Sequence, residues 1–427
     1  MKELLTNANR IQGEIVIPGD KSISHRSIMF AAIAHGTSKI TGFLHAEDCI
    51  STMNIFRSLG VQIDELEDGS VVVHGKGIEG LQAPNGALDA GNSGTTMRLL
   101  AGLFSGFPFK LKMIGDASLS KRPMNRVMIP LRQMGASISG SEGSEFAPLY
   151  IQPVDHLNAI EYDMPVASAQ VKSSILLAGL SAKGTTIIHE KEKSRDHTER
   201  MLRQFGVNIE VNDKDISLEG GQTLTASDVQ VPADISSAAF FIVAALLVKD
   251  SQLRMPNVGL NPTRAGIIQV LKDMGGLIET NYKATGLSAD LTVRSSVLKG
   301  TEFGGDIIPT LIDEIPIIAL AATQAEGQTI IRDAQELKVK ETDRIQVTAQ
   351  ELNKMGANII ETEDGMIITG PTPLHAADVD SHGDHRIGMM LQIAALLVEE
   401  GTVHLTDAEA VNISFPSFFD DLARIVD

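Results

Sequence analysis

The sequence is poor in cysteine, in long apolar runs and in positive charge. Cys49 is the single cysteine among 427 residues, which excludes an internal disulfide and any metal site built from several cysteines. The longest apolar run, Ala238 to Val248, is far shorter than the roughly 20 residues that cross a bilayer. The net charge of −18 argues against a nucleic-acid or anionic-membrane surface. We therefore expect no nucleic-acid partner and no membrane partner.

The first ten residues, Met1 to Arg10, contain neither an apolar core nor a small-residue cleavage site, so we expect no signal peptide. A cytoplasmic protein that acts as a monomer is the expectation. An apolar content of 43% and a charged content of 21% are typical of globular proteins. At 427 residues the chain exceeds one ordinary core, which predicts two domains.

A repeat runs through the chain. The helix-end pattern apolar-x-x-apolar-Gly recurs, and its glycines lie 75, 71, 69 and 81 residues apart. Glycine suits the left-handed position that ends such a helix. The glycines are Gly60, Gly135, Gly206, Gly275 and Gly356. In step with them, six Ala-rich helices are predicted to begin just after Asp20, Asn92, Ser168, Asp234, Asp313 and Asp384. Fixed spacing of this kind indicates a repeated fold unit.

Each unit reads as strand, helix, strand, helix, strand, strand, and the sixth copy lacks its last strands. This predicts an α/β protein of two domains, each with three βαβαββ repeats. We place one domain at residues 20–231 and the other, discontinuous, at residues 1–19 plus 232–427. A leading strand near Ile11–Ile17 completes the C-terminal domain, so that the chain crosses between domains twice.

The first of these predicted helices begins in the stretch from Gly19 to Ser27. A helix N-terminus attracts anions, and Lys21 and Arg26 add two cations there. Cations at this end oppose the helix dipole by about 0.3–1 kcal/mol each. Either the turn binds an anion or it is a solvated helix start with two surface cations; charge placement alone leaves both open.

Further motifs each allow a functional and a structural interpretation. Asn92 to Thr96 is a small-residue helix start that an anion can approach closely, or an ordinary cap. Arg122 can grip a carboxylate or phosphate with parallel hydrogen bonds, or lie in a surface basic loop.

The acidic candidates are similarly ambiguous. The spacing predicts that Lys340, Glu341 and Arg344 share one face of a helix. Glu341 is then either a catalytic carboxylate held among cations or one member of a set of solvated ion pairs. Asp313 and Glu314 open an apolar helix, where Asp313 is a candidate base or a cap. His382 to Arg386 lacks further metal ligands, which favours a helix start presenting Arg386 over a metal site.

Taken together, the motifs supply cations from both halves of the chain and two acidic candidates. Two unit charges about 4 Å apart interact by about 4 kcal/mol at an effective dielectric of about 20. A site that binds two polyanions together therefore needs several cations. The cations are Lys21, Arg26, Arg122, Arg344 and Arg386.

These motifs, in this order, resemble the 5-enolpyruvylshikimate-3-phosphate synthase family over nearly the whole chain. The matching segments are Gly19-Asp20-Lys21-Ser22, Gly91-Asn92-Ser93-Gly94-Thr95, Lys121-Arg122-Pro123-Met124, Ser168-Ala169-Gln170-Val171-Lys172, Asp313-Glu314, Lys340-Glu341-Thr342-Asp343-Arg344 and Gly383-Asp384-His385-Arg386. Two more, Arg195 to Glu199 and Asn261 to Arg264, resemble the second, bacterial class, in which weaker inhibition by glyphosate is common. The resemblance implies two inverse α/β-barrel-like domains, each with threefold internal symmetry and the active site in the interdomain cleft.

The resemblance also implies a reaction. The 5-hydroxyl of shikimate 3-phosphate attacks C2 of phosphoenolpyruvate while C3 is protonated, and the tetrahedral intermediate loses phosphate. Asp313 would be the base, and Glu341 and Lys21 would serve the methylene proton and the leaving phosphate. No metal or organic cofactor is implied. Shikimate 3-phosphate would be held by Lys21, Ser22, Arg26, Ser168, Ala169, Gln170, Ser194, Asp313 and Lys340. Phosphoenolpyruvate would be held by Lys21, Gly94, Arg122, Gln170, Arg344 and Arg386.

Two positions depart from the family pattern. Ile413 stands where some members have lysine, and Glu336 where some have asparagine.

Three alternative functions remain open at this level. A UDP-N-acetylglucosamine enolpyruvyl transferase usually has a cysteine in one loop. The corresponding loop here, Gly115 to Ser118, contains none, which disfavours this alternative. An RNA-terminal phosphate cyclase is disfavoured by the acidic balance, and a non-enzymatic anion-binding protein by the absence of a signal segment.

Overall fold

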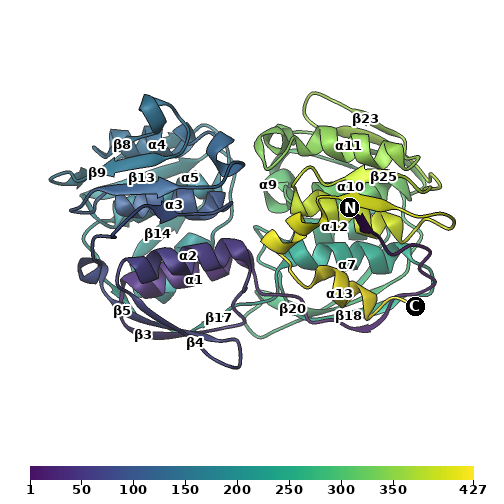
Figure 1. The fold of residues 1–427 in the computed structure, drawn as a ribbon, viewed down its shortest axis with the longest axis horizontal. Coiled ribbons are helices and arrows are strands. Elements are labelled where there is room, and N and C mark those ends of the chain that lie inside the picture. Colours follow the sequence, from purple (N-terminus) through teal and green to yellow (C-terminus); the bar gives the residue numbers. More distant parts are fainter. The chain divides into compact units, whose positions relative to one another are not determined.

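The computed structural model describes residues 1–427, which divide into two compact units. One unit, Gly19–Val231, is continuous in sequence; the other combines Met1–Pro18 with Pro232–Asp427 and is discontinuous. Figure 1 labels the elements of both. Each unit has its own hydrophobic core.

The continuous unit contains three copies of a βαβαββ repeat. Its helices are α1 (Lys21–Ile33), α2 (Glu47–Ser58), α3 (Gly94–Phe104), α4 (Asn125–Gln133), α5 (Ala169–Gly179) and α6 (His197–Gln204), with 3₁₀ turns η1 (Ile78–Gly80), η2 (Leu119–Lys121) and η3 (Ser141–Gly143). Its strands are β3 (Ala34–Thr41), β4 (Gln62–Glu65), β5 (Val71–Lys76), β6 (Leu88–Asp89), β7 (Leu111–Ile114), β8 (Ser137–Ser139), β9 (Leu149–Gln152), β10 (Leu157–Asn158), β11 (Glu161–Met164), β12 (Ala182–Lys183), β13 (Thr185–Glu190), β14 (Ile209–Asn212), β15 (Asp215–Glu219), β16 (Leu224–Thr225) and β17 (Val229–Gln230).

The discontinuous unit repeats the same plan. Its helices are α7 (Ile235–Leu247), α8 (Gly266–Asp273), α9 (Ile308–Leu311), α10 (Ile315–Thr323), α11 (Arg344–Lys354), α12 (His385–Ala395) and α13 (Phe418–Ala423), with 3₁₀ turns η4 (Gly305–Ile307), η5 (Gln335–Val339) and η6 (Ala408–Ile413). Its strands are β1 (Lys2–Glu3), β2 (Gln12–Glu14), β18 (Gln252–Gly259), β19 (Leu277–Tyr282), β20 (Ser288–Arg294), β21 (Glu302–Phe303), β22 (Gly327–Ile331), β23 (Ile359–Glu361), β24 (Met366–Gly370), β25 (Asp378–Asp380) and β26 (His404–Thr406).

The four-stranded sheets share one strand order. In β6-β7-β9-β8, for example, a short leading strand pairs parallel with the strand after the first helix, and the last two strands add antiparallel. The same order holds for β11-β13-β15-β14 and β21-β22-β24-β23. The repeated α/β fold predicted from the spacing is therefore confirmed.

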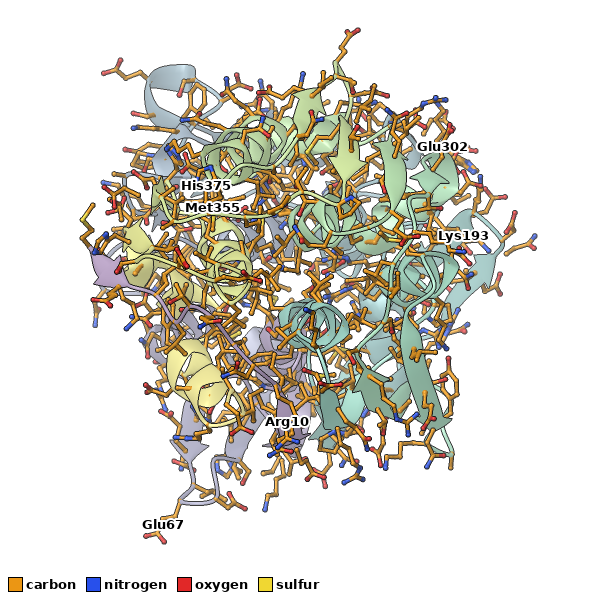
Figure 2. The ribbon with its side chains drawn as sticks, turned by 90° about the vertical axis from the view of Figure 1, so that its right-hand side faces the viewer. Arg10, Glu67, Lys193, Glu302, Met355 and His375 are labelled. Carbon is orange, nitrogen blue, oxygen red and sulfur yellow. The ribbon has the colours of Figure 1, made fainter.

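The leading strands of two repeats come from distant parts of the chain. N-terminal β2 pairs parallel with β18 of the discontinuous unit, whereas β17 pairs parallel with β3 of the continuous unit. In the sixth repeat β1 pairs antiparallel with β26 and so replaces a strand that the repeat lacks. Arg10, labelled in Figure 2, forms an ion pair with Asp427 and joins the two ends of the chain.

Helix ends follow the sequence signals. Asp20 caps α1 by accepting a hydrogen bond from the Ile23 amide, and Ser168 caps α5 in the same way. Gly60 and Gly356 follow α2 and α11 with φ of +86° and +97°, which a residue with a side chain rarely adopts. Two starts lie one residue later than expected, because α3 begins at Gly94 and α10 at Ile315.

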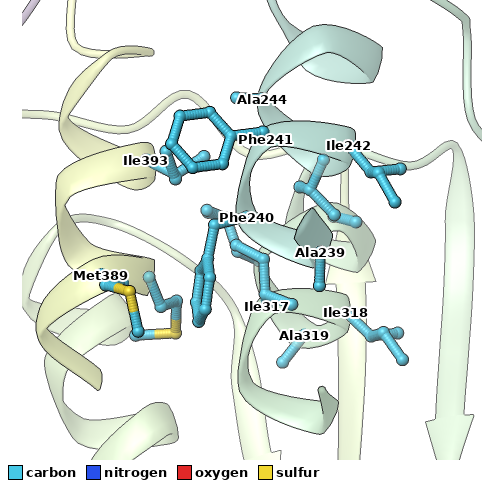
Figure 3. Packing of buried hydrophobic residues seen from close by; sticks show 14 of the residues in the cluster. Ala239, Phe240, Phe241, Ile242, Ala244, Ile317, Ile318, Ala319, Met389 and Ile393 are labelled. Carbon is cyan, nitrogen blue, oxygen red and sulfur yellow. The ribbon is translucent and has the colours of Figure 1, made fainter. Parts of the chain in front are cut away.

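The Ala-rich helices form the core of each unit. In the discontinuous unit α7, α10 and α12 pack against one another, and small alanines let them approach closely (Figure 1). Figure 3 shows Phe240 and Phe241 of α7 among Ile317, Met389 and Ile393. Each fully buried side chain of this size contributes about 1.5–3 kcal/mol. The cores therefore hold the starts of these helices, where the candidate residues lie, in fixed positions. No helix is long and apolar enough to span a membrane.

Candidate functional site

Lys21 is the first residue of α1 and lies beside α2. Its Nζ is 3.1 Å from Oδ2 of Asp48, which lies in the first turn of α2 and is nearly buried. The carboxylate offsets the unfavourable placement of a cation at a helix N-terminus. Ser22 follows, and its carbonyl oxygen accepts a hydrogen bond from Nη1 of Arg26 at 3.0 Å.

Arg26 is buried and reaches from α1 to α5 and α6, the last two helices of the unit. Its Nε donates to Oγ1 of Thr198 at 2.7 Å, and its Nη2 donates to Oγ of Ser173 at 2.9 Å. Neighbouring His25 is fully buried, and burial, together with Lys21 and Arg26, lowers the pKa of its imidazole well below the usual value. His25 is therefore neutral near pH 7 and adds no charge beside the two cations.

The starts of α3 and α5 are joined by polar contacts. Gln170 accepts from Nη1 of Arg98 at 2.8 Å and donates to Oγ1 of Thr95 at 3.2 Å. A Cβ on Gly94 would lie 2.9 Å from Nη1 of Arg98 and 3.4 Å from Nη1 of Arg122. Glycine at this position therefore lets two guanidinium groups approach the N-terminus of α3. Such a turn is suited to hold an anion.

The start of α5 lies near the loop between β13 and α6. Ser168 caps the helix and Ala169 is its first residue. In the loop, Ser194 donates two hydrogen bonds to Oε1 of Glu190, one from its amide at 3.0 Å and one from its hydroxyl. Its carbonyl oxygen accepts from Nζ of Lys172 at 3.4 Å. Ser194 is thus held by a buried ionic group that the sequence did not indicate.

The discontinuous unit carries a second cluster, centred on Arg344. This guanidinium is 1% exposed and contacts three carboxylates. Its Nη1 lies 3.1 Å from Oδ1 of Asp313, its Nη2 lies 2.6 Å from Oε2 of Glu341, and its Nε lies 2.7 Å from Oδ2 of Asp384. Burial alone would lower the pKa of Arg344, but the charges of Asp384, Glu341 and Asp313 raise it.

Asp313 is also close to two more cations. Its Oδ1 lies 3.7 Å from Nζ of Lys340, and its Oδ2 lies 3.8 Å from Nη2 of Arg386. Nη1 of Arg386 lies 3.9 Å from Oε1 of Glu314, which is buried. Positive charge around both oxygens stabilises the ionised form of Asp313, as a carboxylate that accepts a proton requires.

One expectation about this cluster is wrong. Lys340 and Glu341 were expected to share a helix face with Arg344, but α11 begins at Arg344 and Asp343 is its cap. Lys340 and Glu341 therefore lie in the turn between η5 and α11. Asp343 accepts from the amides of Ile345 and Gln346, and this capping fixes where the helix begins.

The structure groups the predicted residues by unit. Asp313, Lys340, Glu341, Arg344 and Arg386 form the cluster of the discontinuous unit. The starts of α1, α3 and α5 carry the rest: Lys21, Ser22, Arg26, Gly94, Ser168, Ala169 and Gln170, with Arg122 after η2 and Ser194 before α6.

Sequence reasoning missed the acidic and hydroxyl partners of these groups. Asp48 beside Lys21, and Asp384 beside Arg344, are the main omissions. Asp384 stands in a motif whose predicted role was confined to Arg386. Ile413 lies at the end of η6 and is partly buried, and Glu336 approaches Nζ of Lys340 to 4.0 Å. No group of three or more His, Cys, Asp or Glu side chains is arranged to hold a metal ion.

Comparison with known proteins gives consistent matches. The model of the family described as EPSP synthase (3-phosphoshikimate 1-carboxyvinyltransferase) matches residues 5–422. A 3-phosphoshikimate 1-carboxyvinyltransferase of Listeria monocytogenes serotype 4a is 58% identical over 427 residues, covering 99% of this chain and 100% of the relative. One of Enterococcus faecalis is 58% identical over 425 residues, covering 99% of each.

Solved structures agree with these sequence matches. An EPSP synthase from Acinetobacter baumannii has a TM-score of 0.88 and 46% identity, covering 99% of this chain and 98% of that one. The enolpyruvyl transferase NikO from Streptomyces tendae has a TM-score of 0.81 at 21% identity, covering 100% and 97%. The second likeness shows the fold alone.

Proposed function

The chain belongs to the EPSP synthase family, and we propose that the two clusters described above carry out its reaction. The protein transfers the enolpyruvyl group of phosphoenolpyruvate to the 5-hydroxyl of shikimate 3-phosphate and releases phosphate. This is a step of the shikimate pathway, which leads to chorismate and the aromatic amino acids. The roles of individual side chains in this reaction are the substance of the proposal.

Asp313 is the proposed base toward the 5-hydroxyl of shikimate 3-phosphate. A general base has to be ionised and within hydrogen-bond reach of the proton that it removes. The cations Lys340, Arg344 and Arg386 around its oxygens favour ionisation. This surrounding of one carboxylate by three cations is the observation that carries the proposal.

Protonation of the methylene carbon and departure of phosphate require an acid and positive charge. We assign these roles to Glu341 and Lys21. Each already pairs with an opposite charge, Glu341 with Arg344 and Lys21 with Asp48. Such pairs fix the position of a side chain before substrate binds, which lowers the barrier because little reorganisation remains.

The remaining residues are proposed to bind the two anions. Shikimate 3-phosphate would be held by Lys21, Ser22, Arg26, Ser168, Ala169, Gln170, Ser194, Asp313 and Lys340. Phosphoenolpyruvate would be held by Lys21, Gly94, Arg122, Gln170, Arg344 and Arg386. These residues come from both units, so we propose that binding of the two substrates requires both units. The chemistry is acid–base chemistry of the chain's own side chains, and we propose a cytoplasmic monomer.

A coupled assay of phosphate release tests the function. Release of phosphate from phosphoenolpyruvate should require shikimate 3-phosphate. The parallel reaction with UDP-N-acetylglucosamine should give no release above background. Release with the nucleotide sugar, and none with shikimate 3-phosphate, would assign the chain to the sister enolpyruvyl transferase instead.

A further inference from the structure

Two helices of the continuous unit, α5 and α6, meet through polar side chains where apolar ones would be the usual choice. Lys172 and Ser173 of α5 face Glu199 and Thr198 of α6, and Glu190 at the end of β13 completes the group. We call these five residues the α5–α6 seam. All five are buried.

Lys172 is the centre of the seam. Its side chain is 1% exposed, and its Nζ lies 3.0 Å from Oε2 of Glu190 and 2.6 Å from Oε1 of Glu199. Burial raises the pKa of Glu199, and the charge of Glu190 adds to this, while Lys172 opposes it. Buried charges cost several kcal/mol each to desolvate, and well-packed apolar residues often serve stability as well or better. Stability alone therefore does not account for the seam.

The ionic half of the seam holds Ser194. Glu190 accepts from both the amide and the hydroxyl of Ser194, and Lys172 donates to its carbonyl oxygen. The next residue back, Lys193, projects outward (Figure 2) and pairs with exposed Asp213 at 2.8 Å. The loop is therefore exposed at Lys193, whereas Ser194 is held through its amide, its hydroxyl and its carbonyl oxygen.

The hydroxyl half of the seam holds Arg26. Oγ of Ser173 and Oγ1 of Thr198 lie 2.6 Å apart, and each accepts from a different nitrogen of the Arg26 guanidinium. Lys172 and Ser173 are consecutive, as are Thr198 and Glu199. One helix contact therefore orients two groups, Arg26 and Ser194, that come from separate parts of the chain.

We propose that the α5–α6 seam is a positioning device for shikimate 3-phosphate, setting its affinity through Arg26 and Ser194 without touching it. This inference rests on the proposed function, since Arg26 and Ser194 are proposed ligands of that substrate. Lys172, Glu190, Ser173, Thr198 and Glu199 are positioning residues. A seam that served only to stabilise the fold would affect both substrates, or neither.

Two pairs of matched variants test the seam. Glu190→Gln turns an amide donor toward Lys172 and weakens the hold on Ser194, whereas Glu192→Gln makes the same change at a half-exposed residue that pairs with Lys214. Ser173→Ala removes an acceptor of Arg26, whereas Ser174→Ala changes a neighbouring buried hydroxyl that has no hydrogen-bond partner. Thermal unfolding of each variant shows whether it is folded.

Calorimetric binding of shikimate 3-phosphate, without phosphoenolpyruvate, is the main measurement. We expect Glu190→Gln and Ser173→Ala to raise the Kd about tenfold, equivalent to about 1.4 kcal/mol. Both control variants should bind as wild type does. In steady-state kinetics the KM for shikimate 3-phosphate should rise in the same proportion, with the KM for phosphoenolpyruvate and kcat within about threefold.

Three results would overturn the proposal. If wild type binds shikimate 3-phosphate and the seam variants bind it equally well, the seam does not position its ligands, and the proposed function stands. The same holds if the variants lose kcat and the affinity for both substrates together. If wild type itself fails to bind shikimate 3-phosphate, both the proposed function and this inference are wrong.

Discussion

Arg344 holds Asp384 with two of its nitrogens: Nε donates to Oδ2 at 2.7 Å and Nη2 to Oδ1 at 3.2 Å. Asp384 also caps α12 by accepting from the amide of Arg386 at 2.9 Å. One carboxylate thus connects the first residue of α11 with the start of α12. Two-pronged pairing of this kind fixes direction as well as distance.

Asp384→Asn should weaken the fold of the discontinuous unit. Asparagine is as good a helix cap as aspartate, so the change removes charge from buried Arg344 and leaves the cap in place. Breaking a buried ion pair costs about 3–5 kcal/mol of the free energy of unfolding. Because Arg344 keeps two other carboxylates, we expect a loss near the lower end of this range. Urea unfolding measures this loss. Asp378→Asn, at an exposed residue, is the control, and equal midpoints for the two variants would contradict the prediction.

Asp313→Ala should lower turnover while substrate binding remains measurable. General base catalysis contributes about 10²–10⁴-fold, and kcat is expected to fall by a factor in this range. Phosphate release gives kcat and calorimetry gives affinity. Asp306→Ala, at an exposed residue of η4, should leave both unchanged. Turnover close to wild type in Asp313→Ala would remove this residue as the base.

Lys21→Met should impair both binding and rate, because we assign Lys21 to both substrates and to the leaving phosphate. The variant also leaves Asp48 without its 3.1 Å cation partner. KM for each substrate and kcat are the measurements. Lys39→Met, which breaks an exposed pair with Asp68, is the control. Kinetics unchanged by Lys21→Met would exclude the start of α1 from the active site.

Gly102→Ala should destabilise the continuous unit. A Cβ at this position would lie 2.1 Å from the carbonyl oxygen of Ser174, so α3 and α5 would have to move apart. Overpacking of this kind typically costs about 1–3 kcal/mol. Gly86→Ala, where an added Cβ meets nothing within 4 Å, is the matched control. Chemical denaturation of both variants would show whether the helix contact is as tight as these distances state.

His189 should make stability depend slightly on pH. Hydrogen bonds to Asp215 and then Glu161 raise the pKa of its imidazole to about 8. The unfolded value is about 6.5, so the stabilisation is fully present below about pH 6.5 and is lost as pH rises through 8. The group is exposed and screened, so the effect is small and weaker in high salt. The difference in Tm between wild type and His189→Asn should shrink from pH 6 to pH 9; a constant difference would contradict this.

The sequence predicted the repeat because its signals are local. Gly206 and Gly356 end helices through backbone geometry, and Asp20 and Ser168 start them through capping, all within a few residues. The start of α11 was misplaced, since Lys340 to Arg344 offers several charged residues but Asp343 alone makes the capping contacts. Local charge spacing does not tell which side chain binds the backbone.

The partners of the site residues were not predictable in the same way. Asp48 meets Lys21 across 27 residues, and Asp384 meets Arg344 across 40. Glu190 and Lys172 are joined by the packing of α5 against β13. Such pairs depend on which helices become neighbours, and no short pattern records it.

The pairing of β1 with β26, of β2 with β18, and of Ile11 with Val426 bears on how the chain folds during synthesis. Residues 19–231 contain all they need and can fold while the ribosome is still at work. The first 18 residues, although made earliest, must wait for β18, which follows this unit in the chain, and for β26 and Val426, which emerge last. Newly made chains should therefore pass through a stage in which one half is native and the amino-terminal tail is still unattached, open to proteases and chaperones.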